Sequence, residues 1–132
     1  MNEKEINRIT GIIVNAAYEV HKEIGPGLLE SVYQTCLIKE LIIRGLFVQQ
    51  NVSIPVIYKG EELNKDFIID ILVENEVIVE LKAVETILPV HEAQLISYLK
   101  LADKRIGLLI NFNVALIKEG IKRKINGHIE TV

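Results

Sequence analysis

Two short runs rich in β-branched residues, 66–73 and 77–84, constrain the fold of this chain more than any other feature. Only three polar residues, 74–76, separate the two runs. Strand-like runs joined by such a short gap are typical of a β-hairpin. A hairpin centred on this gap places Leu72 opposite Ile78, and we therefore predict an antiparallel pair of strands in the middle of the chain.

Hydrophobic periodicity predicts the elements on either side of the hairpin. Apolar residues spaced by three and four indicate amphipathic helices, and alternating apolar residues indicate strands. In chain order, we expect helices over 4–23 and from about 28 to 44, an extended segment over 46–58, the two hairpin strands, a helix over about 90–102 that Pro89 opens, a strand over 105–112 and a last strand within 120–129. This order, ααβββαββ, predicts an α/β (α+β) fold with helices on a mixed central sheet, in a single domain over residues 1–132.

Composition excludes several classes of protein. The chain is 49% hydrophobic and 25% charged, which is typical of a folded globular domain and not of a disordered one. No apolar run approaches the roughly 18–20 residues that cross a bilayer, and the polar start lacks the apolar segment of a secretory signal. The single cysteine, Cys36, excludes an internal disulfide and a cysteine-based zinc site. These features predict a cytoplasmic protein without membrane contact, with Cys36 in its core.

Charge is divided unevenly along the chain. The net charge is −3, but residues 1–94 carry 8 Lys and Arg against 15 Asp and Glu, whereas residues 95–132 carry 7 against 3. A metal site beside a phosphate-binding surface would produce such an acidic part followed by a basic part, although many other proteins share it.

Three charged residues of the predicted hairpin lie between apolar neighbours: Asp70 in the first strand, and Glu80 and Lys82 in the second. Side chains alternate along a strand, so Ile69 and Ile71 should share one face of the sheet and Asp70 should point to the other. Ionised side chains resist burial unless they are paired or bound to a metal. The pattern therefore marks Asp70, Glu80 and Lys82 as candidate site residues.

The predicted register sets Asp70 opposite Glu80. Directly opposed like charges destabilise a strand pair, so something should offset their repulsion. Lys82 can do so in part, and a divalent cation such as Mg²⁺, which binds carboxylate oxygens, can do so better. The structural alternative is a solvated hairpin face with a Lys–Glu ion pair, and the loose spacing of the three residues leaves both interpretations open.

Asp70 followed by Glu80-Leu81-Lys82 resembles the motif of the PD-(D/E)xK nuclease superfamily, in which an Asp precedes Glu-x-Lys on the next strand. Ile69 stands where many members have Pro. Upstream, the segment 27–33 fits the pattern G-x-x-E-x-x-Y. Together these motifs resemble the GxxExxY proteins, a family within that superfamily, over roughly residues 5–118.

This resemblance implies a restriction-endonuclease-like core and a nuclease that depends on Mg²⁺ or Mn²⁺ and acts on DNA or RNA. It assigns catalytic roles to Asp70, Glu80 and Lys82, with Lys82 assisting the attacking water. Asp70 and Glu80 would hold the metal, together with Glu30 and the backbone carbonyl of Leu81. For Glu30, the structural alternative is a favourable place at the start of a helix, where the helix dipole stabilises an acidic residue.

Other polar residues are candidates for substrate binding. Gln94 and Tyr98 resemble a Gln-x₃-Tyr element that follows Glu-x-Lys in some branches of the superfamily, and His91 shares their helical face. Tyr33 could bond Glu30 or a phosphate, with core packing as the alternative.

Basic residues near the end of the chain are candidates for phosphate contacts. Lys122 and Arg123 lie in the basic run 118–124, for which a solvated face is the favoured alternative. His21 could face the site or cap the end of its helix.

Two further classes of function stay open. One is a non-catalytic module that keeps the nuclease fold and binds nucleic acid or protein. The other is a structural subunit whose acidic hairpin pairs with a basic partner or with a second copy of the chain. A homodimer is compatible with a nuclease as well, because two small copies would allow paired cuts.

Overall fold

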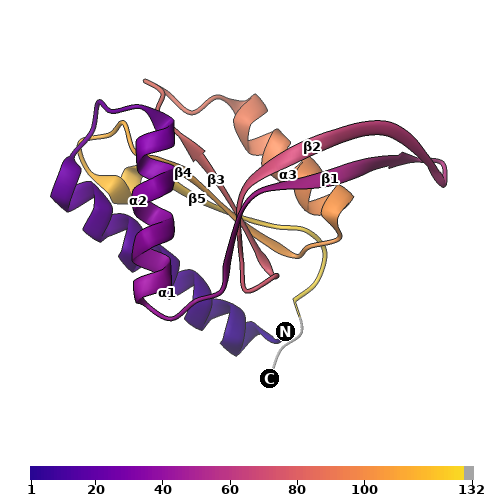
Figure 1. Cartoon of the computed structure of the whole chain (residues 1–132), viewed down its shortest axis with the longest axis horizontal. Helices are drawn as coiled ribbons and strands as arrows, with labels where there is room; N and C mark the ends of the chain where they lie inside the picture. The colour runs from indigo at the N-terminus through magenta and orange to yellow at the C-terminus, as the bar shows by residue number, and fades with distance from the viewer. Residues whose placement is uncertain (130–132) are drawn as a thin grey trace.

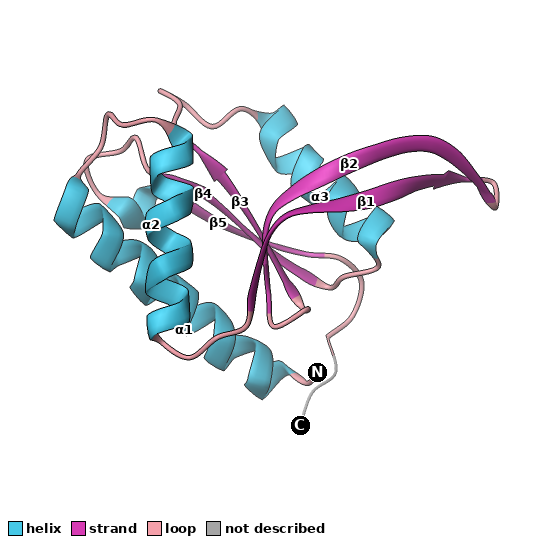
Figure 2. Cartoon of the chain, in the orientation of Figure 1, coloured by secondary structure: helices cyan, strands magenta, loops and turns pink. Residues whose placement is uncertain are grey.

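A computed structural model describes residues 1–129 and shows a mixed five-stranded sheet flanked by helices (Figures 1 and 2). The elements are, in chain order, α1 (Glu3–Ile24), α2 (Glu30–Ile43), β1 (Val48–Tyr58), β2 (Glu61–Val73), β3 (Val77–Lys82), α3 (Pro89–Ala102), β4 (Ile106–Asn111), the 3₁₀ helix η1 (Ile117–Gly120) and β5 (Ile121–Ile125). The predicted fold class and the order ααβββαββ are confirmed. Residues 130–132 of the predicted domain lie outside the described residues. No helix within residues 1–129 is long and apolar enough to span a membrane.

The sheet has the strand order β1-β2-β3-β4-β5. β3 and β4 are parallel, and every other neighbouring pair is antiparallel. A parallel pair needs a crossover connection, and α3 supplies it between β3 and β4. The predicted hairpin register is confirmed, because Leu72 pairs with Ile78. The last pair between β2 and β3 is Ile71 with Val79, and the next positions away from the turn, Asp70 and Glu80, are not part of the ladder.

Apolar side chains cover both faces of the sheet. On one face, Ile9 and Ile13 of α1 and Leu37 of α2 pack in the same core as strand residues such as Leu81. On the other face, α3 forms a second core, which includes the strand residue Leu109. Figure 1 shows α1 and α2 together on one side of the strands and α3 on the other. Helices on both faces explain why the hairpin strands are apolar almost throughout.

The strict alternation predicted for the first hairpin strand is wrong at Ile69. Ile69 packs in the core beneath α3, whereas Ile71 packs in the core beneath α1 and α2. The face to which the side chains point therefore changes between these two residues, at Asp70. The position opposite Asp70 in β1 is Asn51, whose φ of 50° is in the left-handed region. A residue in that conformation interrupts the regular strand geometry on which alternation depends.

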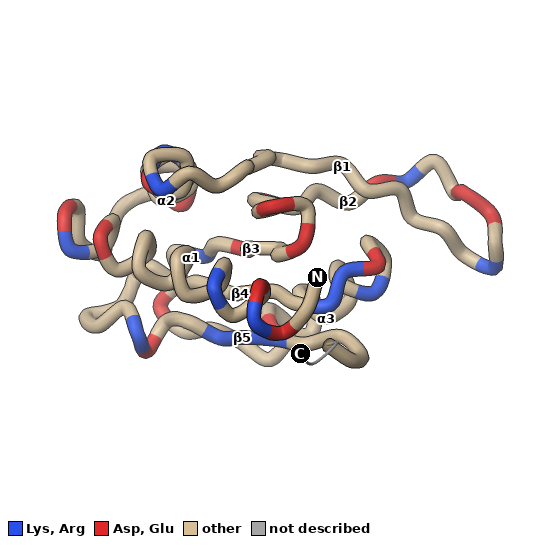
Figure 3. Tube along the Cα trace, turned by 90° about the horizontal axis from the view of Figure 1, so that it is seen from below, with Lys and Arg blue, Asp and Glu red and all other residues tan. Residues whose placement is uncertain are grey.

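β1 and β2 continue beyond the sheet as a two-stranded arm (Figures 1 and 2). The arm turns at Lys59 and Gly60, and β2 begins at Glu61, earlier than the predicted start at 66. Figure 3 shows acidic and basic residues together at the far end of the arm. The segment 61–66 is exposed and mostly polar, which is why hydrophobic alternation did not reveal it as part of a strand.

Candidate active site

The carboxyl groups of Asp70 and Glu80 lie where the β2–β3 ladder ends. The backbone N–H of Asp70 donates a hydrogen bond to Glu80 Oε1 at 3.3 Å. In return, the backbone N–H of Leu81 donates to Asp70 Oδ2 at 2.8 Å. The side chains thus bind backbone groups of the opposite strand, and this exchange brings the two carboxyl groups together between the strands.

Glu80 is almost completely buried, with 4% of its surface exposed. Burial raises its pKa to about 9, and a hydrogen bond with the carboxyl of Asp70 and the negative charge of Asp70 act in the same direction. The backbone N–H of Asp70 and the charge of Lys82 lower the pKa, but by less. In the protein alone, a proton on Glu80 therefore offsets the repulsion between the carboxyl groups more effectively than Lys82 does.

Glu30 joins this group from the first turn of α2. Although the residue is exposed, partial burial of its carboxyl raises its pKa, and so does the negative charge of Asp70. The charge of Lys82 lowers the same pKa. Asp70 and Lys82 thus act on both Glu30 and Glu80, so the fold brings near one another the four residues that the resemblance to the nuclease motifs groups in one site.

Tyr98 of α3 lies on the same side of the sheet as Glu80. Burial raises its pKa first, and the negative charges of Glu80 and Asp70 raise it further. Its ring stacks on Phe67 of β2, with centroids 4.5 Å apart. Gln94, one turn earlier on α3, is half-buried. Tyr98 and Gln94 therefore lie one turn apart on the helix that covers the face of the sheet to which Glu80 belongs.

His91 has a structural contact at the start of α3. Its Nδ1 accepts a hydrogen bond from the backbone N–H of Leu88 at 3.0 Å, so the neutral ring carries its proton on Nε2. This bond satisfies a backbone group at the helix start, and it leaves only the Nε2–H for a substrate.

Tyr33 takes the core-packing alternative that the sequence left open. It is fully buried and its ring stacks on Phe112, with centroids 4.6 Å apart. Its hydroxyl donates to the carbonyl of Gly25 at 2.7 Å and accepts from the N–H of Leu28 at 3.1 Å. The hydroxyl is occupied by the backbone of the loop between α1 and α2, so Tyr33 does not belong to the substrate surface. His21 also has a structural contact, since its Nε2 lies 2.7 Å from the carbonyl of Val114.

The structure separates Lys122 from Arg123, although the sequence grouped them. Lys122 pairs with Leu109, which also pairs with Glu80, and all three positions lie on the α3 face. Arg123 pairs with Leu108, whose side chain belongs to the opposite core. Its guanidinium donates to Asn7 of α1 at 3.0 Å. Of these two residues, only Lys122 therefore lies on the face of Glu80.

Gln34 is a contact of the site that the sequence interpretation missed. Its Nε2 donates to the backbone carbonyl of Asp70 at 3.0 Å and to Asn51 Oδ1 at 2.9 Å. Gln34 follows Glu30 by four residues and so lies on the same face of α2. That spacing was the one signal in the sequence that could have found it.

Asn111 is a second missed residue, and it lies beside the end of β3. It is buried and pairs in register with Lys82. Its side chain accepts from the N–H of Val84 at 3.1 Å and donates to the carbonyl of the same residue at 2.9 Å. Asn111 thereby fixes the chain as it leaves Lys82.

The donor set of the site fits a hard divalent cation completed by substrate. Within residues 1–129, no three or more His, Cys, Asp or Glu side chains converge as a ready-made metal site. Asp70 and Glu80 offer two adjacent carboxyl groups, and Glu30 lies near them. Mg²⁺ is commonly held by one or two carboxylates, with waters and substrate phosphate completing its shell. The residues present match that mode of binding.

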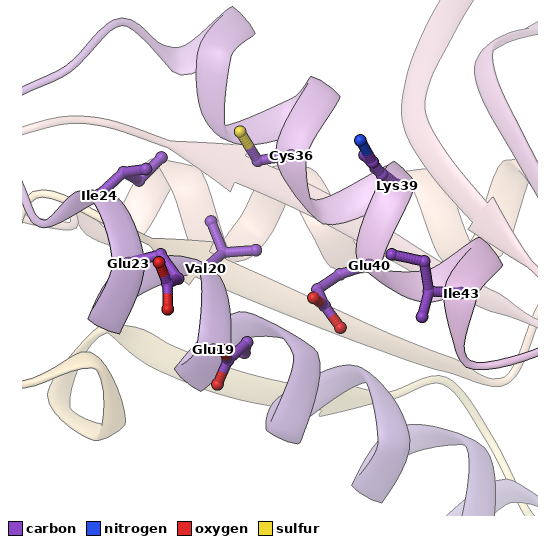
Figure 4. A pocket seen from close by; sticks show the side chains of 8 residues that line it. All are labelled: Glu19, Val20, Glu23, Ile24, Cys36, Lys39, Glu40 and Ile43. Atoms are coloured by element: carbon purple, nitrogen blue, oxygen red, sulfur yellow. The ribbon is translucent and has the colours of Figure 1, made fainter.

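A pocket elsewhere in the molecule does not involve the carboxyl pair. It has a volume of about 190 Å³. Figure 4 shows that it lies between α1 and α2. Its lining includes Val20, Ile24 and Cys36 with an acidic rim of Glu19 and Glu23. Cys36 is half-buried there and packs against the core, whereas the sequence predicted a place within the core.

Comparison with known proteins gives one match. A sequence model of the PD-(D/E)XK nuclease superfamily matches residues 7–124, which include all the candidate site residues. No curated protein and no solved structure shows significant similarity to the chain.

Proposed function

The chain belongs to the PD-(D/E)XK nuclease superfamily, and we propose that it is a metal-dependent nuclease that hydrolyses phosphodiester bonds in DNA or RNA. Nucleases of this superfamily generally depend on a divalent metal, and membership implies binding of nucleic acid. The observation that carries the proposal is the adjacent pair Asp70 and Glu80, each of which accepts a hydrogen bond from a backbone N–H of the opposite strand. Burial and the charge of Asp70 raise the pKa of Glu80, and a bound cation would favour the ionised form of Glu80.

The proposed metal ligands are Asp70 and Glu80, with Glu30 and the backbone carbonyl of Leu81 assisting. Mg²⁺ or Mn²⁺ fits this set of oxygen donors. When bound, such an ion polarises a phosphoryl oxygen and lowers the pKa of a water molecule in its shell. Because Asp70 and Glu80 each bond a backbone N–H of the opposite strand, their carboxyl groups are held in place before any ligand arrives.

Lys82 is the proposed catalytic lysine. It follows Glu80 by two residues in β3, so both side chains point to the same face of the sheet. Its positive charge acts on both Glu80 and Glu30. From this position the ammonium group can orient the attacking water and stabilise negative charge that develops on the phosphate.

The α3 face of the sheet is the proposed substrate surface. Gln94 and Tyr98 would orient the nucleic acid over the carboxyl pair, and Lys122 would contact a phosphate to one side. His91 contributes at most its Nε2–H, because Nδ1 is already bonded. Tyr33 and Arg123 are left out of this surface because their polar groups have partners elsewhere.

A nuclease assay with matched variants tests the proposal. Wild type should cleave single- or double-stranded DNA or RNA in the presence of Mn²⁺ or Mg²⁺, and Lys82→Ala should be folded but inactive. Calorimetry should show metal binding to wild type and none to Asp70→Asn. A folded Lys82→Ala protein with full activity would refute the role of Lys82. Binding of nucleic acid without metal and without cleavage would favour the non-catalytic module.

Two finer assignments stay predictions from the sequence. Membership of the GxxExxY family is predicted from Gly27, Glu30 and Tyr33. The cytoplasmic location is predicted from the single cysteine. Light scattering on the purified protein would test whether it forms a homodimer, which the sequence leaves open.

A further inference from the structure

The backbone of Asp70 is held by side chains instead of by its neighbouring strands. The β1–β2 ladder includes the pairs on either side of it but not Asn51 with Asp70, and the β2–β3 ladder ends at Ile71. The N–H of Asp70 instead donates to Glu80 Oε1. Its carbonyl instead accepts from Gln34 Nε2. Gln34 is therefore the contact of α2 with the backbone of a proposed metal ligand.

The same amide group also holds the irregular residue of β1. Gln34 Nε2 carries two hydrogens, and its second acceptor is Asn51 Oδ1 at 2.9 Å. Asn51 has a φ of 50°, a conformation that Asn tolerates better than most residues. One side chain of α2 thus bridges the left-handed residue of β1 and the carbonyl of Asp70.

This bridge lies where β2 changes the faces to which its side chains point. Regular alternation would direct Asp70 to the α3 face together with Leu72. Instead, Asp70 Oδ2 lies between the strands and accepts the N–H of Leu81. Ile69 and Ile71, on either side, pack in opposite cores. The change of face and the bridge from Gln34 therefore both occur at Asp70, whose carboxylate must point toward the proposed metal site.

We propose that Gln34, acting through the backbone of Asp70 and through Asn51, is a positioning residue of the active site. It holds Asp70 so that its carboxylate meets that of Glu80, and it fixes the distance of both from Glu30, one turn earlier on α2. This inference rests on the proposed nuclease function, because it assigns Gln34 a part in the same site.

Gln34→Met tests the proposal, because Met has a similar length but no donor. Loss of an outer-shell partner of a metal ligand typically weakens metal affinity by 10–100-fold, and we expect the Kd for Mn²⁺, measured by calorimetry, to rise by about that factor. The kcat for cleavage should fall while KM for nucleic acid changes by less than about threefold, because Gln34 acts on the reacting groups and not on substrate affinity. Thr35→Ala, at an exposed neighbouring position of α2, is the control and should match wild type.

Two variants of Asn51 separate the hydrogen bond from the backbone conformation. Asn51→Gly removes the acceptor but keeps a residue that adopts positive φ freely, so its effect should be smaller than that of Gln34→Met. Asn51→Val also removes the acceptor and places a β-branched residue at positive φ, so its effect should be as large or larger. Equal metal affinity in wild type, Gln34→Met and Asn51→Val would overturn the positioning role.

Amide hydrogen exchange distinguishes this failure from failure of the nuclease proposal. The N–H of Leu81 is bonded to Asp70 Oδ2, so its exchange reports the placement of Asp70 without metal or substrate. We expect faster exchange at Leu81 in Gln34→Met, with exchange at Val79 of the same strand unchanged. If wild type bound no metal but exchange at Leu81 became faster in Gln34→Met, the positioning of Asp70 by Gln34 would stand and the nuclease proposal would fall. Unchanged exchange at Leu81 in Gln34→Met would refute the positioning role of Gln34, whatever the nuclease activity.

Discussion

Glu80→Gln should change how the stability of the metal-free protein depends on pH. Glu80 is 4% exposed, and its pKa lies at about 9 in the folded protein against an ordinary value of 4.5. Between these values the folded state keeps a proton that the unfolded state releases, so the stability of wild type falls as pH rises. Below 4.5 both states hold the proton, and above about 9 both release it, so the loss is confined to that window.

The size of the effect follows from the width of the window. One pKa unit corresponds to about 1.4 kcal/mol, so between pH 5 and pH 8 wild type should lose up to about 4 kcal/mol that the variant keeps. Gln has nearly the shape of protonated Glu and can accept the N–H of Asp70 as Glu80 does. The difference between the two proteins isolates this one group, because the other groups titrate in both.

Urea unfolding followed by circular dichroism, in the presence of a chelator and at intervals from pH 5 to pH 9, measures the effect. Glu85→Gln removes one carboxyl from an exposed position close to Lys82 and controls for the loss of a charge as such. The reasoning is refuted if the free energies of unfolding of wild type and Glu80→Gln differ by the same amount at every pH.

Metal should offset much of the loss in wild type. At pH 8, Mn²⁺ at 100 times its Kd should stabilise wild type by about 2.7 kcal/mol, because it binds only the folded state. Glu80→Gln should gain much less, since one of the two proposed carboxylate ligands is gone. Equal stabilisation of both proteins by Mn²⁺ would place the metal elsewhere.

Four further substitutions test other parts of the structure. Tyr33→Phe should destabilise the protein by about 1–2 kcal/mol in urea unfolding, because it removes the hydroxyl bonds to the loop, and it should leave Mn²⁺ affinity unchanged. Tyr98→Phe should keep the stack on Phe67 and hence stability, while reducing kcat; unchanged kcat would exclude the Tyr98 hydroxyl from the reaction. Lys122→Ala should lower the slope of log affinity for nucleic acid against log salt by about 0.7–0.9, whereas Arg123→Ala should not, and the opposite result would assign the substrate to the α1 face.

The sequence alone predicts the hairpin correctly, because the residues that determine its register are close together in the chain. A three-residue gap between two apolar runs admits few registers, and the one centred on the gap correctly pairs Leu72 with Ile78. The fold class followed as well, since periods of two and of three to four residues change at clear boundaries. The proximity of Asp70 and Glu80 then follows directly from the register.

The change of face at Asp70 could not be predicted from the strands alone. Alternation is a property of regular backbone, and Asn51, which departs from it, is hydrogen-bonded to Gln34, which lies in another element and 17 positions earlier. The roles of Tyr33 and Arg123 had the same dependence on tertiary context. Helical spacing places Tyr33 near Glu30, but the packing of α2 decides that the tyrosine is buried on Phe112 while the glutamate is exposed.

The carboxylates of this site accept backbone hydrogen bonds in addition to their proposed role as metal ligands, and both roles govern how they should be tested. Asp70 Oδ2 is the acceptor of the Leu81 N–H. Replacement of Asp70 by Ala would leave that donor without a partner, at a cost of about 1–3 kcal/mol, so lost metal binding could reflect a loosened hairpin. Asp70→Asn keeps an oxygen acceptor for the N–H and removes only the charge. If Asp70→Asn loses metal binding yet keeps amide protection at Leu81, the charge of Asp70 binds the ion and its geometry supports the sheet, as two separable properties of one side chain.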